Sequence, residues 1–166
     1  MSSPFVAILM GSKSDLEAMQ AGAEILRNFG IRYEIKISSA HRTPEATRNY
    51  VENAVERGCQ VFIAGAGLAA HLAGAIAAHT TRPVIGVPME GGPLKGFDAL
   101  LSTVQMPAGV PVASVAIGRT GARNAAYLAA QILALADGDL AERVAADRQA
   151  DAERVQAQDR ALQEQQ

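Results

Sequence analysis

The 166-residue sequence has a single cysteine, Cys59, and no tryptophan. One cysteine cannot form an intrachain disulfide, so a disulfide-stapled fold is excluded. The lack of disulfides is typical of a reducing compartment, and we expect the protein in the cytoplasm. Cys59 precedes an apolar segment and is expected to be a small buried hydrophobic residue.

An excess of charge of one sign is also missing. Fifteen Lys and Arg residues are set against 17 Asp and Glu residues, for a formal net charge of −2. Without a basic excess we expect no nucleic-acid partner. No apolar run approaches the roughly 20 residues of a membrane-spanning helix, so we expect no membrane segment. The short apolar run at 5–10, with no charged segment before it, predicts no secretory signal.

Several familiar site motifs are absent. No Gly-x-Gly-x-x-Gly or Walker sequence indicates dinucleotide or triphosphate binding. No Gly-x-Ser-x-Gly elbow indicates a serine hydrolase. The Cys and His residues do not have the spacing of metal ligands, so we expect no metal site.

What the chain does contain is a regular alternation of apolar runs and helical segments. Short apolar runs rich in β-branched residues predict buried parallel strands. The segments between them have helical periodicity, and the segment at 44–57 begins with proline and is followed by glycine. The predicted strands are 5–10, 32–38, 60–64, 83–87 and 111–117. The predicted helices are 16–29, 44–57, 71–78, 97–104 and 122–136.

This alternation predicts one α/β domain over residues 1–137, with a parallel sheet between helix layers. From residue 138 the chain is rich in Asp, Glu, Arg, Gln and Ala and has few large apolar residues. Residues 138–166 therefore predict a long exposed helix or a partly disordered tail. Such a tail buries little surface alone, and we expect it to pack on a neighbouring subunit.

The loops that follow the predicted strands contain the unusual residues. Right-handed crossovers put all strand-to-helix loops on one edge of a parallel sheet. The loops at 11–15, 38–43, 65–70 and 88–96 then share that edge, where open α/β sheets bind their ligands. The sequence therefore predicts a site at this edge.

The loop at 38–43 holds His41 and Arg42 among small residues. Histidine is the side chain best suited to give and take a proton near neutral pH. The planar guanidinium of Arg42 can bind an anion such as phosphate. The alternative is a capping turn in which both side chains are only solvated.

The loop at 11–15 joins a strand to a helix. Helix N-termini bind anions through free N–H groups and the helix dipole, and Ser12 and Ser14 add hydroxyl groups. Asp15 could accept hydrogen bonds from ribose hydroxyls. The alternative is that Ser14 or Asp15 only caps the helix.

The loop at 65–70 presents backbone amides with almost no side-chain bulk, and it could cover a flat ring or enclose a small neutral molecule. His71 follows it at the start of a helix, either as a supporting donor at the site or as an ordinary helix-terminal residue. The loop at 88–96 is rich in Gly and Pro and predicts a flexible flap.

Six segments together match a known family. They are MGSKSD at 10–15, SAHRTP at 39–44, AGAG at 64–67, AAHL at 69–72, PVIGVP at 83–88 and LLSTVQMP at 100–107. In their order and spacing the chain resembles the PurE family, the N5-carboxyaminoimidazole ribonucleotide (N5-CAIR) mutases of de novo purine biosynthesis. The resemblance runs from about residue 6 to residue 135 and does not include the tail.

The resemblance implies a fold, an assembly and a reaction. The fold would be a flavodoxin-like three-layer αβα sandwich, and the assembly a homo-octamer with active sites at subunit contacts. The substrate would be a ribonucleotide with an aminoimidazole base. The reaction would move a carboxylate from the exocyclic nitrogen N5 to ring carbon C4, giving 4-carboxyaminoimidazole ribonucleotide. No metal, biotin, ATP or other cofactor is implied.

The resemblance also implies roles for individual residues. His41 would be the general acid/base. Ser12, Asp15 and Arg42 would bind the ribonucleotide, with Ser39 beside Arg42 at the phosphate. The residues lining the base and the carboxylate would be Gly65, Ala66, Gly67, Ala70, His71 and Leu72.

Three departures leave the shape of the carboxylate pocket open. Leu68 stands where the family usually has glycine, Ala73 where proline is common, and residues 90–93 replace a serine-containing loop. One alternative is therefore a direct aminoimidazole ribonucleotide (AIR) carboxylase that uses free CO2, although the AAHL segment favours the mutase. Another is a non-enzymatic flavodoxin-like nucleotide-binding module, which rests on fold analogy alone.

Overall fold

The computed structural model describes residues 4–165 of the chain. Its strands are β1 (Phe5–Met10), β2 (Tyr33–Ile37), β3 (Cys59–Ala66), β4 (Val84–Pro88) and β5 (Ala113–Ser114). They form one parallel sheet in the order β2-β1-β3-β4-β5. Its helices are η1 (Lys13–Asp15), α1 (Leu16–Asn28), α2 (Pro44–Glu56), α3 (Leu72–Ala77), α4 (Phe97–Val104), α5 (Gly118–Ala134) and α6 (Gly138–Gln163).

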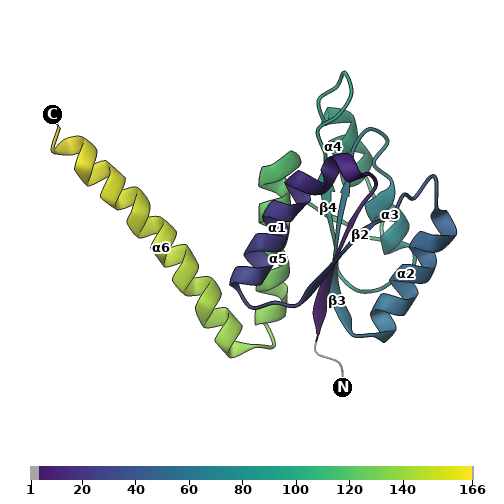
Figure 1. Ribbon diagram of the computed structural model, residues 1–166, viewed down its shortest axis with the longest axis horizontal. Coiled ribbons are helices and arrows are strands. Elements are labelled where there is room, and N and C mark those ends of the chain that lie inside the picture. The colour runs from purple at the N-terminus through teal and green to yellow at the C-terminus, as the bar shows by residue number, and fades with distance from the viewer. Residues whose placement is uncertain (1–3, 166) are drawn as a thin grey trace.

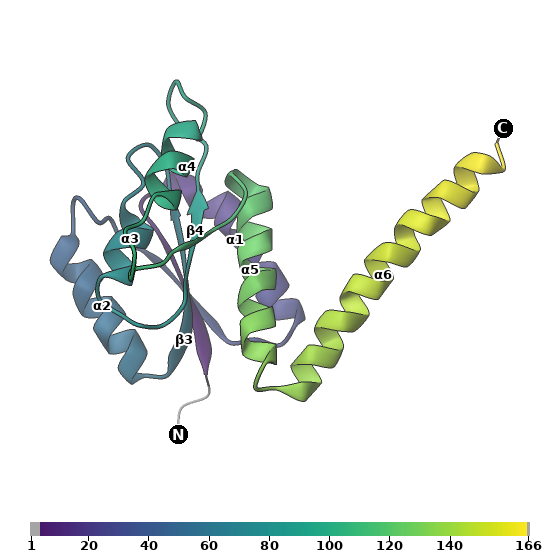
Figure 2. The same ribbon diagram turned by 180° about the vertical axis from the view of Figure 1, so that it is seen from behind.

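Helices cover both faces of the sheet, with α1 and α5 on one side and α2, α3 and α4 on the other (Figures 1 and 2). This arrangement and the strand order are those of a flavodoxin-like αβα sandwich, so the predicted fold is confirmed. Strand β1 explains why: all of its residues are buried, and alternate side chains belong to the two opposite core clusters. A strand buried on both faces has a continuous apolar sequence.

The close contact between α1 and α5 depends on small residues. A Cβ atom on Gly22 of α1 would lie only 2.5 Å from the carbonyl oxygen of Ala122 in α5. The buried residues of α5 are all glycines and alanines, which let the two helices approach. The alanine-rich helix of the sequence is therefore a packing surface inside the subunit.

The end of the sheet differs from the sequence prediction. The predicted strand at 111–117 is paired only over Ala113–Ser114, at the edge of the sheet next to β4. Helix α5 begins at Gly118, four residues before the predicted start at Ala122. Glycine is a poor helix former, which hid this first turn. Gly121 is required there because a Cβ atom would lie 1.6 Å from the oxygen of Ala116.

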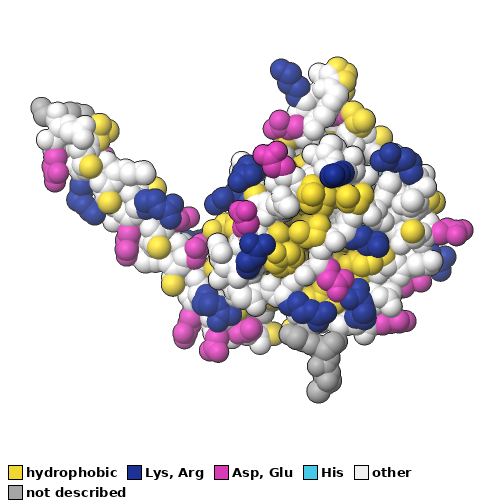
Figure 3. Space-filling view, viewed as in Figure 1, with side chains coloured by type: hydrophobic (Ala, Val, Ile, Leu, Met, Phe, Trp, Pro, Cys, Tyr) yellow, Lys and Arg dark blue, Asp and Glu magenta, His cyan; other side chains and the backbone are white. Residues whose placement is uncertain are grey.

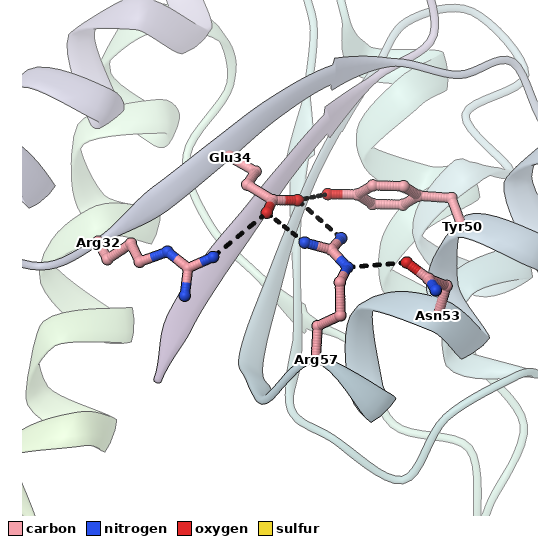
Figure 4. Close-up of polar contacts among 5 residues, drawn as sticks. All are labelled: Arg32, Glu34, Tyr50, Asn53 and Arg57. Carbon is pink, nitrogen blue, oxygen red and sulfur yellow. Dashed lines mark hydrogen bonds and ion pairs between the residues drawn. The ribbon is translucent and has the colours of Figure 1, made fainter. Parts of the chain in front are cut away.

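A polar cluster fastens the edge strand β2 to α2 (Figure 4). The Glu34 carboxylate accepts hydrogen bonds from both terminal nitrogens of Arg57 and, at 2.9 Å, from the hydroxyl of Tyr50. Arg32 lies 3.7 Å away, and Asn53 accepts a hydrogen bond from Arg57 Nε. The Arg57 bonds hold the pKa of the Glu34 carboxyl below its usual value. The cluster fixes the two elements that flank the loop holding His41.

Helix α6 extends away from the domain (Figures 1 and 2). Its first turns are attached: Asp137 caps Leu140 N, Leu140 is buried in the core, and the Tyr127 hydroxyl donates to Asp147. From residue 148 to 165 every residue is exposed. The sequence predicted either a long exposed helix or a partly disordered tail, and the structure shows the long exposed helix.

Across residues 4–165, none of the helices combines the length and the apolar character needed to cross a membrane.

Candidate functional site

The loops that follow β1, β2, β3 and β4 surround one cavity of about 550 Å³ at the carboxyl edge of the sheet. Most of the sequence-predicted site residues line it. They are Ser12, Asp15, Ser39, His41, Arg42, Ala66, Gly67, His71 and Leu72. Residues separated by up to 60 positions thus come together because their strands are parallel neighbours in the sheet.

Two predicted site residues do not line the cavity. Gly65 is buried behind it, where a Cβ atom would lie 2.6 Å from Met19 Sδ, so this glycine makes room for the α1 side chain. Ala70 is likewise buried, at 2% exposure. Glu90 also lines the cavity. The sequence analysis named residues 90–93 as a departure that affects the carboxylate pocket but gave Glu90 no role, although its loop lies on the shared edge.

Local hydrogen bonds build the turn that presents His41. Ser39 N donates to Thr43 Oγ1 at 3.1 Å, and Thr43 N donates to Ser39 O at 2.9 Å. Beneath it, Thr47 Oγ1 donates to Thr43 O at 3.0 Å, so its only hydrogen is used. The buried Ser38 hydroxyl must therefore donate to Thr47 Oγ1, 2.7 Å away. The turn is thereby fixed to the first turn of α2.

His41 lies against His71, which comes from the loop between β3 and α3. His41 Nε2 is 2.7 Å from His71 Nδ1, and the two rings are nearly perpendicular. Both side chains are exposed to the cavity. An imidazole pair of this kind can hold and transfer a proton.

Arg42 connects the loops after β1 and β2. Its Nη2 donates to Gly11 O at 3.2 Å, and its backbone N donates to Ser39 Oγ at 3.2 Å. The guanidinium keeps further N–H groups for a ligand, because it has five in all. With the two serines at 12 and 39 beside it, this end of the cavity is suited to an anion.

Asp15 is placed for binding and not for capping. Ser12 caps η1 by accepting a hydrogen bond from Ser14 N at 3.3 Å, whereas Asp15, the residue before α1, makes no side-chain cap bond. Burial is the main cause that raises the pKa of the Asp15 carboxyl, while hydrogen bonds from Ser14 and from Ser12 act in the opposite direction. The carboxylate lines the cavity and can accept hydrogen bonds from ligand hydroxyls.

The small-residue loop after β3 and the flap after β4 form the remaining wall. Met89 N donates to Ala66 O at 2.8 Å, so the flap begins hydrogen-bonded to the loop. Leu68 has φ +56°, in the left-handed region that glycine adopts readily. A Cβ atom on Gly92 would lie 2.7 Å from Leu68 Cδ2, so this side chain lies against the flap.

The other hollows in the described part of the chain are lined by none of the sequence-predicted site residues. No group of three or more His, Cys, Asp or Glu side chains within it is arranged to hold a metal ion. A larger hollow of about 1080 Å³ is lined by the ends of α2 and α3 and the segment before β5. It contains none of the sequence-predicted site residues.

Comparisons with known proteins identify the family of the chain. The family model described as "AIR carboxylase" matches residues 5–154. The N5-carboxyaminoimidazole ribonucleotide mutase of Bacillus subtilis is 56% identical over 85% of this chain and 87% of its own. The Escherichia coli K12 mutase is 54% identical over 84% of this chain and 82% of its own. A crystal structure of Treponema denticola PurE superposes with a TM-score of 0.86 at 33% identity, covering 96% of this chain and 99% of that one.

Proposed function

Because the chain belongs to the AIR carboxylase family, we propose that it is an N5-carboxyaminoimidazole ribonucleotide mutase of purine biosynthesis. It converts N5-CAIR to 4-carboxyaminoimidazole ribonucleotide. The observation that carries the proposal is the meeting of His41, Arg42 and Asp15 in one cavity. We propose a cytoplasmic location as well, in keeping with the unpaired thiol of Cys59.

The ribonucleotide is held at its charged end. Arg42 binds the phosphate with its free N–H groups, assisted by the hydroxyls of Ser12 and Ser39. Asp15 accepts hydrogen bonds from the ribose. The imidazole and its carboxylate then lie toward the small-residue loop, along Ala66, Gly67, His71 and Leu72. Gly65 and Ala70 are buried and support this wall of the cavity.

One proton serves both halves of the reaction. Protonated His41 gives a proton to N5 as the N5–carboxylate carbon bond breaks, which leaves the amine and CO2. Ring carbon C4 supplies the electron pair for a new bond to CO2. Neutral His41 then takes the proton from C4 and returns to its starting state, so protons and electrons balance. The flap and the small-residue loop hinder the escape of CO2.

A direct AIR carboxylase is the second candidate. The description of the family model names that activity, and Leu68 and Glu90 change the wall next to the flap. The two candidates use different substrates. Purified protein is incubated with N5-CAIR in one series and with aminoimidazole ribonucleotide and bicarbonate in the other. Efficient turnover of the second mixture alone would replace the mutase by the carboxylase.

We propose that the working form is a homo-oligomer, an octamer by family resemblance. Apolar side chains gather on the face seen in Figure 3, over the region of β2, where Ile35 and Ile37 are 39% and 51% exposed. Helix α4 exposes a second apolar row made of Phe97, Leu101 and Val104. Contiguous exposed apolar surface of this kind is typical of subunit contacts.

Two variants test the assigned roles. His41→Asn removes the acid/base group and should reduce kcat by roughly 10²- to 10⁴-fold while the nucleotide still binds. Arg42→Ala should mainly weaken binding, by about ten- to a hundredfold, because the phosphate loses charge-assisted hydrogen bonds. Discontinuous activity assays measure kcat, and calorimetric titration with aminoimidazole ribonucleotide measures binding. Full activity in His41→Asn would refute the mechanism.

A further inference from the structure

Leu68 is an apolar side chain in a place where the core does not use it. It lies on the loop after β3 with φ +56°, in the left-handed region that glycine adopts freely and that is costly for a residue with a side chain. Leu68 is 53% exposed and belongs to neither of the two buried clusters of the described chain. Backbone strain that core packing does not offset points to a use at the cavity, which Leu68 lines.

The flap at 88–96 is held at both of its ends. At its start Met89 N donates to Ala66 O at 2.8 Å, next to the last paired residues of β3 and β4. At its end a Cβ atom on Gly96 would lie 3.2 Å from Met89 O, so the two ends of the flap lie against each other. Between these ends the flap projects beyond the sheet, before α4 (Figures 1 and 2).

The projecting part of the flap meets Leu68 at Gly92. A Cβ atom on Gly92 would lie 2.7 Å from Leu68 Cδ2, and Gly92 has φ +61°. Both residues line the cavity, so their contact closes its wall between the loop after β3 and the flap. A methyl group of Leu68 faces the α-carbon of Gly92, and the contact is therefore apolar.

An apolar closure suits the intermediate of the proposed reaction. CO2 is small and neutral and has no hydrogen-bond donor, so an ion pair cannot hold it in the cavity. It is retained only while the wall has no opening to water. A methyl group in the wall excludes water and CO2 alike.

We propose that Leu68 is the positioning residue that keeps the flap closed while CO2 is free, so that CO2 returns to C4 of the same nucleotide. The proposal rests on the mutase function above. The bond from N5 to the carboxylate carbon breaks, and the bond from C4 to that same carbon forms, before the flap opens. His41 moves the proton as described, and no further reactant is required.

Proteolysis of the unliganded protein tests the contact without any activity. Trypsin cleaves after Lys95, which is exposed on the flap, and the open flap is the better substrate. Leu68→Gly removes about half the burial of a leucine side chain, so cleavage there should speed up roughly three- to tenfold. Leu68→Met keeps an apolar side chain of similar volume and should restore the wild-type rate. Cleavage after Arg154, on the exposed part of α6, is the internal control.

Equal cleavage after Lys95 in the wild type and in Leu68→Gly would overturn the contact. Thermal unfolding of the same variants separates the closure from folding. Because Leu68 is strained and lies outside the core, Leu68→Gly should leave Tm unchanged or raise it. A clear fall in Tm would make Leu68 a structural residue and would overturn the proposal.

Isotope partition tests the role in the reaction. N5-CAIR with ¹³C in its carboxylate is turned over in excess unlabelled bicarbonate, and label in the carboxylated product is compared with a blank without protein. The wild type should keep most of the label. In Leu68→Gly the ratio of released to transferred label should rise roughly three- to tenfold, since the open flap is more populated by that factor. Leu68→Met should behave as the wild type, and so should Leu94→Ala, which changes an exposed flap residue outside the cavity lining.

The two assays separate the failure of each proposal. Equal partition of label in the wild type and in Leu68→Gly would refute the retention of CO2 by Leu68 and leave the mutase intact. A wild type whose flap resists trypsin but which does not turn over N5-CAIR would refute the mutase, and with it the retention of CO2. The contact between Leu68 and Gly92 would then remain as a finding about the flap alone.

Discussion

Asp15 illustrates how a residue can serve a site at the expense of folding. Its carboxyl has a raised pKa, chiefly because of burial. The folded protein therefore holds this proton more tightly than the unfolded chain. Such a group favours folding at low pH, and this contribution is lost as the pH rises through the folded-state pKa. At neutral pH the ionised carboxylate thus opposes folding while it is available to a ligand.

We predict opposite effects of Asp15→Asn on stability and on binding. The neutral amide removes a half-buried charge, so Tm should rise at pH 7, and the difference from wild type should shrink below about pH 4. Affinity for the ribonucleotide should fall by about ten- to a hundredfold, since hydrogen bonds to a charged acceptor are lost. Thermal scans at several pH values and calorimetry measure the two effects. Glu24→Gln, on the exposed side of α1, is the control; a lower Tm for Asp15→Asn at pH 7 would contradict the argument.

At the scale of elements, the Glu34 cluster holds β2 to α2. Because hydrogen bonds, mainly from Arg57, lower the pKa of Glu34, the ionised form contributes stability above its unfolded-state pKa. This contribution is lost as the pH falls through the folded-state pKa. We predict that Glu34→Gln lowers the free energy of unfolding at pH 7 and that the values for the two proteins converge in acid. Denaturant titrations at pH 7 and pH 3 provide the check, and a constant difference would count against it.

The contact between α1 and α5 gives a second prediction for elements. Alanine is a better helix former than glycine by about 1 kcal/mol, which alone would make Gly22→Ala stabilising. The new methyl group would meet the Ala122 carbonyl at 2.5 Å, so we expect a net loss of about 1–3 kcal/mol. Gly138→Ala, with no atom within 4 Å, is the matched control and should be neutral or stabilising. Urea unfolding of both variants decides between propensity and packing.

These elements also show what the sequence could predict. The alternation of strands and helices predicted the layers of the fold. The rule that strand-to-helix loops share one edge of a parallel sheet predicted that His41, Arg42 and Asp15 lie close together. The first turn of α5 was missed because Gly118 is needed for its positive φ of +69° and Gly121 for a close approach to the Ala116 backbone, and no local pattern records either. The contact of His41 with His71 was missed for a related reason: it depends on how two loops meet above β1, and periodicity carries no information on that.

The whole molecule consists of the αβα domain and the projecting part of α6. Leu140 is buried and Asp147 is bonded to Tyr127, whereas all described residues after position 148 are exposed. We predict that deleting residues 149–166 changes Tm little but lowers the oligomeric state or its stability to dilution. An isolated helix of this length is marginal in water, and a neighbouring subunit would stabilise it.

Analytical ultracentrifugation and thermal scans measure the effect of this truncation. Deleting residues 138–166 is the comparison, and it should lower Tm as well, because Leu140 leaves the core. A shortened protein that sediments as the full-length assembly at every concentration would contradict the expected packing. The domain boundary after residue 137 and the packing of the tail stay predictions until then.

The single cysteine, finally, allows unfolding of the chain to be followed by chemical labelling. Cys59 is fully buried at the start of β3, and burial raises the pKa of its thiol to about 11. A thiol reagent can reach it only in molecules whose central strand has opened. Each labelled chain then marks one opening event, with no background from a second thiol. A nucleotide that binds only the folded form should slow labelling in proportion to its occupancy, and would report its affinity without an assay of turnover.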